Sequence, residues 1–185
     1  MRVDPTSFED LYAAEGDPWS FATSEYELGR YRATLDLLGP AYRRGFEPGC
    51  SVGVLTERIA ERCAALVAVD PSPTAVAAAR QRLAGCDHVQ VEVGAIPEWW
   101  PSGTFDLVVF SELGYYWDRP GLASLLDAVD ALVEPGGDLV AVHWLGESAD
   151  HVLHGDEVHA MLEERFGTPA VTVRRPGFVA ARWRR

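Results

Sequence analysis

A short run of small residues follows the first strand that the sequence predicts. Glu47 leads into a loop that contains Gly49, Ser51 and Gly53 and opens onto a helix. Small side chains let the backbone approach a ligand closely, and a helix N-terminus offers unpaired N–H groups. The chemistry that this spacing favours is the binding of a nucleotide-like ligand.

Three functional hypotheses fit this loop, beside the alternative that it is only a packed turn. As a G-x-S-x-G elbow, residues 49–53 would make Ser51 the nucleophile of a hydrolase, but that elbow needs a larger sheet and an upstream oxyanion-hole motif. A dinucleotide-binding loop needs G-x-G-x-x-G, whose second half is missing here. The third hypothesis is a class I S-adenosylmethionine (SAM) methyltransferase. Its acidic residue and G-x-G-x-G loop match residues 47–53, with serine in place of the middle glycine.

Asp70 ends the second predicted strand and narrows this choice. A carboxylate at that place can accept hydrogen bonds from both hydroxyls of a ribose, as both nucleotide hypotheses require. A solvated strand end is the alternative for this residue alone. The short C-terminal hairpin, the turn at residues 135–137 and the absence of a second substrate domain favour the methyltransferase over a dehydrogenase.

Polar residues follow the fourth and fifth predicted strands. Ser111 and Glu112 come after one strand, and His143 and Trp144 end the other. Both pairs should therefore emerge at the carboxyl edge of the sheet, where open α/β sheets bind ligands. An amine that accepts a methyl group must lose a proton, which a histidine or a carboxylate can take. His143 is the first candidate base and Glu112 the second; a histidine that is only hydrogen-bonded at a strand end is the alternative.

Aromatic side chains lie close to these candidates in the sequence. Tyr115 begins a cluster that runs to Trp117, and Trp19 and Tyr26 could close over it from the N-terminal segment. Aromatic faces attract a sulfonium or an ammonium by about 0.5 to 2 kcal/mol each, and core packing is the alternative. Arg30 could hold a carboxylate with its planar fork, or it could form a surface ion pair.

Three histidines, His151, His154 and His159, raise the question of a metal site. Their spacing, H-x-x-H-x-x-x-x-H, matches none of the zinc patterns, and no cysteine accompanies them. We therefore predict no metal site and expect Gly155 and Asp156 to start a helix.

The candidate site residues lie in a chain whose predicted strands alternate with helices, which is typical of a mostly parallel sheet. Strands are predicted near 45–47, 66–70, 89–93, 105–110 and 138–144, and a hairpin near 171–173 and 178–180. Helices are predicted at 7–14, 24–38, 52–63, 73–83, 122–133 and 156–166. The fold class is α/β: one domain over residues 1–185, with a mostly parallel seven-stranded sheet and an antiparallel C-terminal hairpin. Residues 1–41 are predicted to form a helical cap over the cofactor edge and residues 42–185 the α/β core.

The composition limits the partners of the chain. Its 185 residues carry 16 basic and 28 acidic side chains, for a net charge of −12. Such a chain would repel nucleic acid, so small-molecule ligands are expected. No apolar run reaches the ~18 residues of a membrane span, three cysteines make no disulfide framework, and residues 1–10 lack a signal pattern. We expect a cytoplasmic protein with no membrane partner; the oligomeric state cannot be read from the sequence.

Several segments together resemble the nodulation protein S (NodS) family of SAM-dependent methyltransferases. They are DPW at 17–19, SEYE at 24–27 with RY at 30–31, EPGCSVGVLT at 47–56, FDLVVFSELGYY at 105–116, HW at 143–144 and GDEVH at 155–159. The resemblance covers most of the chain. It implies a Rossmann-like class I methyltransferase fold, SAM as cofactor with S-adenosyl-L-homocysteine (SAH) as its product, and, in the named member, transfer to a sugar amine of a chitin-derived oligosaccharide.

The same resemblance implies where the cofactor lies. Residues 47–53 would line the methionine and ribose side, and Asp70 would hold the ribose. The loop after the third strand would frame the adenine; because this loop has no carboxylate, the backbone of Ala95 and Ile96 must serve. The predicted cofactor-binding set is Tyr26, Arg30, Glu47, Gly49, Cys50, Ser51, Gly53, Asp70, Pro71, Ala95, Ile96, Ser111 and Glu112. The predicted catalytic set is His143, Glu112 and Tyr115.

The resulting expectation is a SAM-dependent methyltransferase that acts on a small or carbohydrate-type acceptor. An amine is preferred over a hydroxyl as the methylated group, on the resemblance alone. The alternatives are a dinucleotide-dependent oxidoreductase and a non-catalytic SAM-binding protein.

Overall fold

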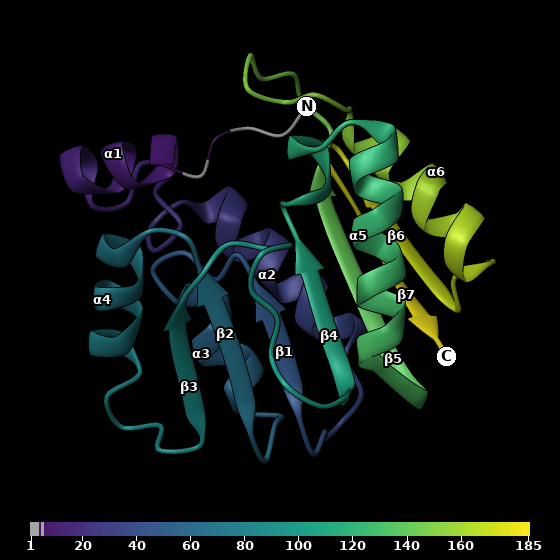
Figure 1. The fold of residues 1–185 in the computed structure, drawn as a ribbon, viewed down its shortest axis with the longest axis horizontal. Coiled ribbons are helices and arrows are strands. Elements are labelled where there is room, and N and C mark those ends of the chain that lie inside the picture. Colours follow the sequence, from purple (N-terminus) through teal and green to yellow (C-terminus); the bar gives the residue numbers. More distant parts are fainter. Residues whose placement is uncertain (1–3, 5) are drawn as a thin grey trace.

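Seven strands form one sheet in the order β3-β2-β1-β4-β5-β7-β6 (Figure 1). The computed structural model describes residue 4 and residues 6–185. The strands are β1 (Gly45–Pro48), β2 (Leu66–Asp70), β3 (Val89–Val93), β4 (Phe105–Ser111), β5 (Val133–Trp144), β6 (Val171–Arg175) and β7 (Phe178–Arg184). The helices are α1 (Thr6–Glu15), α2 (Glu25–Leu37), α3 (Val54–Ala60), α4 (Pro73–Arg82), the 3-10 turn η1 (Gly114–Tyr116), α5 (Arg119–Leu132) and α6 (Gly155–Phe166).

The first five strands are parallel, and β7 pairs antiparallel with both β5 and β6. This confirms the predicted mostly parallel sheet with an antiparallel C-terminal hairpin. The order of the last two strands could not be anticipated: β7 inserts between β5 and β6, so the edge strand is β6. Burial explains this order, because Phe178–Ala181 of β7 are all buried whereas most of β6 is exposed.

Helices cover both faces of the sheet (Figure 1). The apolar face of α5, with Leu122, Leu125, Leu126 and Val129, packs with residues of α6, β4 and β5 in one core cluster. A second cluster joins α2 and α3 to residues of β4, β5 and β7. The strands in the middle of the sheet are therefore buried on both sides, as a parallel sheet requires.

The two N-terminal helices occupy different places, although the sequence predicts one cap over residues 1–41. Helix α1 packs against α4 near the ends of β1 and β2, where a cap is expected. Helix α2 instead lies along the sheet, and its buried Tyr31, Thr34 and Leu37 pack toward α3, β5 and β7. Within the described residues α1, the segment after it and the first turn of α2 with Tyr26 and Glu27 border the cavity, whereas the rest of α2 packs along the sheet. Residues 1–3 and 5 of the predicted cap lie outside the described residues.

Local signals placed most helix ends. Ser72 caps α4 by accepting a hydrogen bond from the N–H of Ala75, with Pro73 at the first helical position, as predicted. Helix α3 is shorter than the predicted 52–63, because Gly53 has a φ of 79° and the chain leaves the helix after Ala60. Strand β5 begins at Val133, earlier than the predicted 138, so the Pro-Gly-Gly turn lies within it at a register shift against β4.

No helix of the described residues is long and apolar enough to cross a membrane.

Candidate active site

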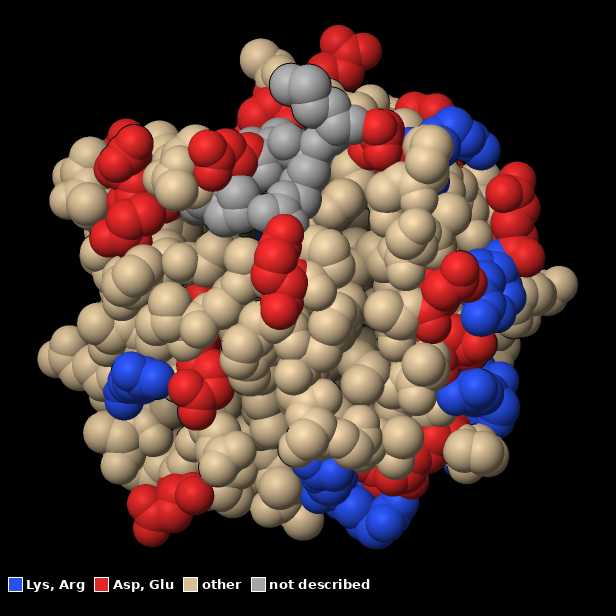
Figure 2. All heavy atoms as spheres, in the orientation of Figure 1, with Lys and Arg blue, Asp and Glu red and all other residues tan. Residues whose placement is uncertain are grey.

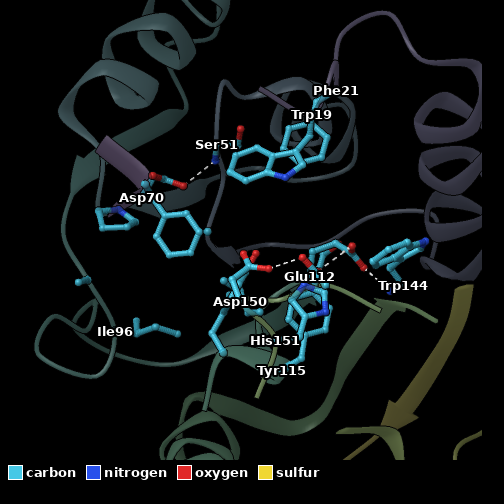
Figure 3. Close-up of a pocket in the computed structure, with 18 of the residues that line it drawn as sticks. Trp19, Phe21, Ser51, Asp70, Ile96, Glu112, Tyr115, Trp144, Asp150 and His151 are labelled. Carbon is cyan, nitrogen blue, oxygen red and sulfur yellow. Dashed lines mark hydrogen bonds between the residues drawn. The ribbon is translucent and has the colours of Figure 1, made fainter. Parts of the chain in front are cut away.

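A cavity of about 450 Å³ opens at the carboxyl ends of the parallel strands (Figure 3). Its walls come from the loop after β1, the end of β2, the loop after β3, η1, the segment after β5, and the N-terminal residues 8–27. A much smaller cavity, about 40 Å³, adjoins it and shares Phe21, Gly49, Ser51, Ser111 and Glu112 with it. The parallel sheet thus brings the residues predicted after its strands to one edge.

The loop after β1 depends on its small residues. Gly49 has a φ of 74°, and a Cβ at this position would lie 2.6 Å from a methyl carbon of Leu113. Ser51 also adopts a left-handed conformation, with a φ of 52°, which is uncommon for a residue with a side chain. Its backbone N–H donates to Asp70 at 2.8 Å, and its Oγ accepts from the Tyr12 hydroxyl at 2.6 Å. Among the described residues no histidine contacts Ser51 through a hydrogen bond, so the hydrolase hypothesis lacks its base.

Asp70 joins two backbone segments at the floor of the cavity. One carboxylate oxygen accepts from the N–H of Ser51 and the other from the N–H of Ser72, at 2.8 and 3.0 Å. Burial raises the pKa of Asp70 to about 6, although these two hydrogen bonds lower it and nearby Glu9 raises it further. Each oxygen can accept more than one hydrogen bond, so Asp70 remains able to receive the two hydroxyls of a ribose.

The small cavity is lined by two buried residues, Glu47 and Arg30, that each have a side-chain atom without a hydrogen-bond partner. Glu47 is only 2% exposed, and its Oε2 has no hydrogen-bond partner. Burial raises the pKa of Glu47 to about 8; the nearby Thr56 hydroxyl lowers it and the charge of Asp70 raises it. The Nε of Arg30 is likewise buried without a partner. Both residues line this cavity, where Oε2 of Glu47 is an acceptor and Nε of Arg30 a donor without a partner among the described residues.

Arg30 also joins a network that the sequence did not indicate. It forms ion pairs with Glu27, one turn earlier on α2, and with Glu112 at the end of β4. Glu112 has a φ of 57°; its Oε1 accepts from the Trp144 N–H at 2.7 Å and its Oε2 from the Tyr115 hydroxyl at 2.9 Å. Burial raises the pKa of Glu27, and the charge of Arg30 opposes that shift. Both oxygens of Glu112 are therefore engaged before any ligand arrives.

His143 requires a correction of its predicted place. The sequence predicts it at the cavity as a base, but the ring is fully buried and lies behind the cavity wall. Its Nε2 accepts from the N–H of Gly114 at 3.1 Å, and its Nδ1 lies 3.3 Å from Nε2 of His159. Burial, and then the nearby His159, lowers the pKa of His143 well below its usual range. The geometry supports a role in holding η1, with no direct access to an acceptor.

The other predicted residues divide between the two cavities. The main cavity is lined by Tyr26, Gly49, Ser51, Asp70, Pro71, Ala95, Ile96, Ser111, Glu112 and Tyr115, and the small one by Arg30, Glu47 and Cys50 among others. Gly53 lines neither, because it faces α4, where a Cβ would lie 3.0 Å from that of Ala79. Their functional roles stay predictions.

Sequence reasoning missed two groups of wall residues. One consists of Phe8, Tyr12 and Phe21, which join Trp19 on the N-terminal side. The four-residue spacing of Phe8 and Tyr12 on a helix could have indicated a shared face. The other group is Ser148, Asp150 and His151, from a loop whose position depends on tertiary contacts.

Comparison with known proteins agrees with this architecture. The family model described as Nodulation protein S (NodS) matches residues 8–166. Nodulation protein S of Sinorhizobium fredii is 33% identical over 165 residues, which cover 82% of this chain and 73% of that protein.

Two solved structures extend the comparison. The N-methyltransferase NodS from Bradyrhizobium japonicum, in complex with SAH, is 26% identical, with 97% of each chain covered and a TM-score of 0.82. A Pseudomonas syringae protein, described provisionally as a methyltransferase, is 40% identical, with 88% of this chain and all of that chain covered and a TM-score of 0.78. These likenesses confirm the predicted class I methyltransferase fold. The chain belongs to the nodulation protein S family.

Proposed function

We propose that this protein transfers a methyl group from SAM to the amine of a small, carbohydrate-type acceptor. Membership of the NodS family makes the chain a SAM-dependent methyltransferase with a small-molecule acceptor. The amine, the carbohydrate character of the acceptor and the roles of individual residues are what we propose. The observation that carries the proposal is one cavity in which the Asp70 carboxylate and an aromatic, acidic wall around Glu112 face the same space (Figure 3).

The described residues fit SAM as the cofactor. Asp70 would hold the ribose hydroxyls, and the backbone of Ala95 and Ile96 would border the adenine. The unpaired Oε2 of Glu47 would accept from the methionine ammonium, and the unpaired Nε of Arg30 would donate to the methionine carboxylate. When bound, SAM supplies a methyl group activated by a sulfonium, so the protein needs neither a metal nor a covalent nucleophile.

The acceptor side of the cavity would position an amine and exclude water. Glu112 is held rigidly by Arg30, Tyr115 and the backbone of Trp144, so its negative charge has a defined place. Aromatic rings of Tyr116, Trp19 and Trp144 line the same space and can contact a sugar ring or an ammonium. Alignment of the acceptor and exclusion of water are the main contributions of a protein to such a displacement.

The surface charge favours a cationic or neutral acceptor. Helix α1, beside the cavity, carries Glu9, Asp10 and Glu15 and no basic residue. Figure 2 shows acidic side chains on the upper part of this face, whereas most of the basic ones lie along its right and lower edges. A ligand that carries an ammonium would be attracted to the acidic part.

Neither alternative function finds support. Both solved structures compared above are methyltransferases by name, and the loop after β1 fits SAM better than a dinucleotide because the G-x-x-G half of the dinucleotide motif is missing. The cytoplasmic location stays a prediction from cysteine usage.

Calorimetry and a transfer assay test the proposal in two steps. SAH, NAD and NADP are titrated separately into one preparation, and we expect micromolar binding of SAH alone. Labelled SAM is then incubated with glucosamine, with a chitin-derived oligosaccharide that carries one free amine, and with its fully N-acetylated counterpart. We expect label transfer to glucosamine and to the oligosaccharide with a free amine, and none to the fully N-acetylated oligosaccharide. Label transfer to a hydroxyl of the acetylated sugar, or binding of a dinucleotide in place of SAH, would overturn the proposal.

A further inference from the structure

The loop after β5 brings a histidine to the acceptor side of the cavity. The N–H groups of Val152 and Leu153 both donate to the carbonyl of Tyr115, at 2.8 and 3.1 Å, and so pin this loop to η1. The His151 ring then stacks on the Tyr115 ring, with centroids 3.7 Å apart and an interplanar angle of 18° (Figure 3). Tyr116 and Trp144 meet it edge-on, at 5.5 and 5.9 Å. One stacked ring and two edge-on rings together fix the plane of the imidazole.

The nitrogens of this ring are unused. Nδ1 of His151 is buried without a hydrogen-bond partner, and Nε2 has no partner among the described residues. The other four histidines all have one: His88 contacts the carbonyl of Ala60, His154 contacts that of Leu145, and His143 and His159 contact each other. A buried imidazole nitrogen without a partner is costly unless a ligand supplies one.

Burial keeps the imidazole of His151 neutral near pH 7. Burial lowers its pKa, the nearby His154 lowers it further, and Asp150 and Glu112 oppose these effects. The remaining titratable neighbours are the phenols of Tyr115 and Tyr116, whose pKa values burial raises, and the buried His143, whose pKa burial lowers. Since these tyrosines and His143 are neutral, Asp150 and Glu112 are, among the described residues, the charges that attract a proton toward this ring.

We infer that His151 is the proton acceptor for the acceptor amine, an inference that rests on the proposed amine methylation. One N–H bond of the bound ammonium breaks, its electron pair stays on nitrogen as the nucleophilic lone pair, and the proton forms an N–H bond on the imidazole. The imidazolium then returns the proton to water at the cavity mouth. The other candidates are less suitable: Glu112 is engaged at both oxygens, His143 does not reach the cavity, and Asp150 is exposed to water and already accepts from the Ser148 hydroxyl.

Enzyme kinetics of His151→Gln and His151→Ala test this assignment, with glucosamine as acceptor. We expect His151→Gln to lower kcat by roughly 10²- to 10⁴-fold, the usual contribution of a general base, with a much smaller change in KM. The kcat of the wild type should level off above about pH 7, whereas that of the variant should keep rising tenfold per pH unit, because deprotonation then depends on hydroxide or on the free amine. Added imidazole should partly restore His151→Ala. His88→Gln, at the amino edge of the sheet, is the matched control and should behave as the wild type.

Two measurements without turnover separate the outcomes. SAH should bind His151→Gln within about twofold of the wild type, which shows that the fold and the cofactor side are intact. The imidazole proton signal that disappears in His151→Gln should titrate in the wild type below the usual histidine pKa of 6.5. A wild-type-like kcat and pH profile for His151→Gln, or a titration at or above 6.5, would overturn the assignment. A wild type that binds SAH but methylates no amine would overturn the proposed function instead.

Discussion

The two halves of the cavity are lined by different kinds of chemical groups. The half proposed to hold the cofactor, formed by residues 47–53 and Asp70, consists of backbone N–H groups, small residues and buried carboxylates that belong to two adjacent strands. The half proposed to hold the acceptor consists of aromatic rings from α1, η1 and the loop 145–154, far apart in the sequence. Adjacent strands can fix a polar site by local geometry, whereas an aromatic wall exists only after distant segments have packed.

Arg30 connects the two halves, and its loss should have the largest effect. Arg30→Met would leave the buried Glu27 and the half-buried Glu112 without their cation. Removal of one partner from such a group costs about 3 to 5 kcal/mol, so the free energy of unfolding in urea should fall by that amount. Arg32→Met, on the exposed side of the same helix, is the control. If the free energy of unfolding falls by less than about 1 kcal/mol, the ion pairs of Arg30 do not couple the two halves of the cavity.

A substitution of Glu47 tests whether burial of this carboxylate lowers the stability of the protein in the absence of SAM. Its pKa in the folded protein, about 8, is above the ordinary 4.5, so the folded state holds a proton that the unfolded state releases. Folding stability from this group is therefore complete below about pH 4.5 and is lost as the pH rises to about 8. We expect Glu47→Gln to gain stability over the wild type across this window, by a few kcal/mol at pH 9.

Urea unfolding at pH 5, 7 and 9 measures this gain, and exposed Glu61→Gln is the control. An equal difference between variant and wild type at all three pH values would contradict the raised pKa of Glu47. The same variant should bind SAH more weakly, since the amide lacks the charge that would pair with the ammonium.

Asp70 tests the polar half by ligand binding. Asp70→Ala should lower the affinity for SAH at least tenfold, about 1.4 kcal/mol, because it removes the acceptor for two ribose hydroxyls and for the Ser51 and Ser72 N–H groups. The pKa of about 6 adds a pH dependence: affinity should weaken as the pH falls below 6 and the carboxyl becomes protonated. Calorimetry checks both effects, with exposed Asp87→Ala as control; unchanged affinity would remove Asp70 from the site.

Tyr12 should have the smallest effect, because it contributes one hydrogen bond from the cap to the cofactor loop. Tyr12→Phe removes the hydroxyl that donates to Ser51 Oγ but keeps the ring that packs on Trp19. A net loss of about 0.5 to 1.5 kcal/mol corresponds to a roughly 2- to 10-fold lower affinity for SAH. Tyr42→Phe, which breaks a bond to Asp138 on the far side of the sheet, should lower stability and leave SAH affinity unchanged. Equal affinities of the two variants would show that the cap does not hold the loop.

The fold shows the same difference between features set by local sequence and features set by the packing of distant segments. The strands that the sequence placed best are those whose residues are buried on both faces or alternate clearly, such as β2 and β4. The position of β7 between β5 and β6, and the separation of α2 from the cap, depend on which apolar surfaces meet. Local patterns contain no information on that choice.

The sequence alone determined the geometry of the loop after β1 and the position of Asp70 beside it, because glycine at positions of positive φ, a strand end and a carboxylate one strand away are local requirements. It also placed Glu112 and Tyr115 at the correct edge, since parallel strands end together. Only the tertiary structure decided that His143 faces the core while His151 faces the cavity, and that Arg30 is already paired with Glu27 and Glu112. Which of several histidines stays free depends on the neighbours that each one finds after the chain has packed.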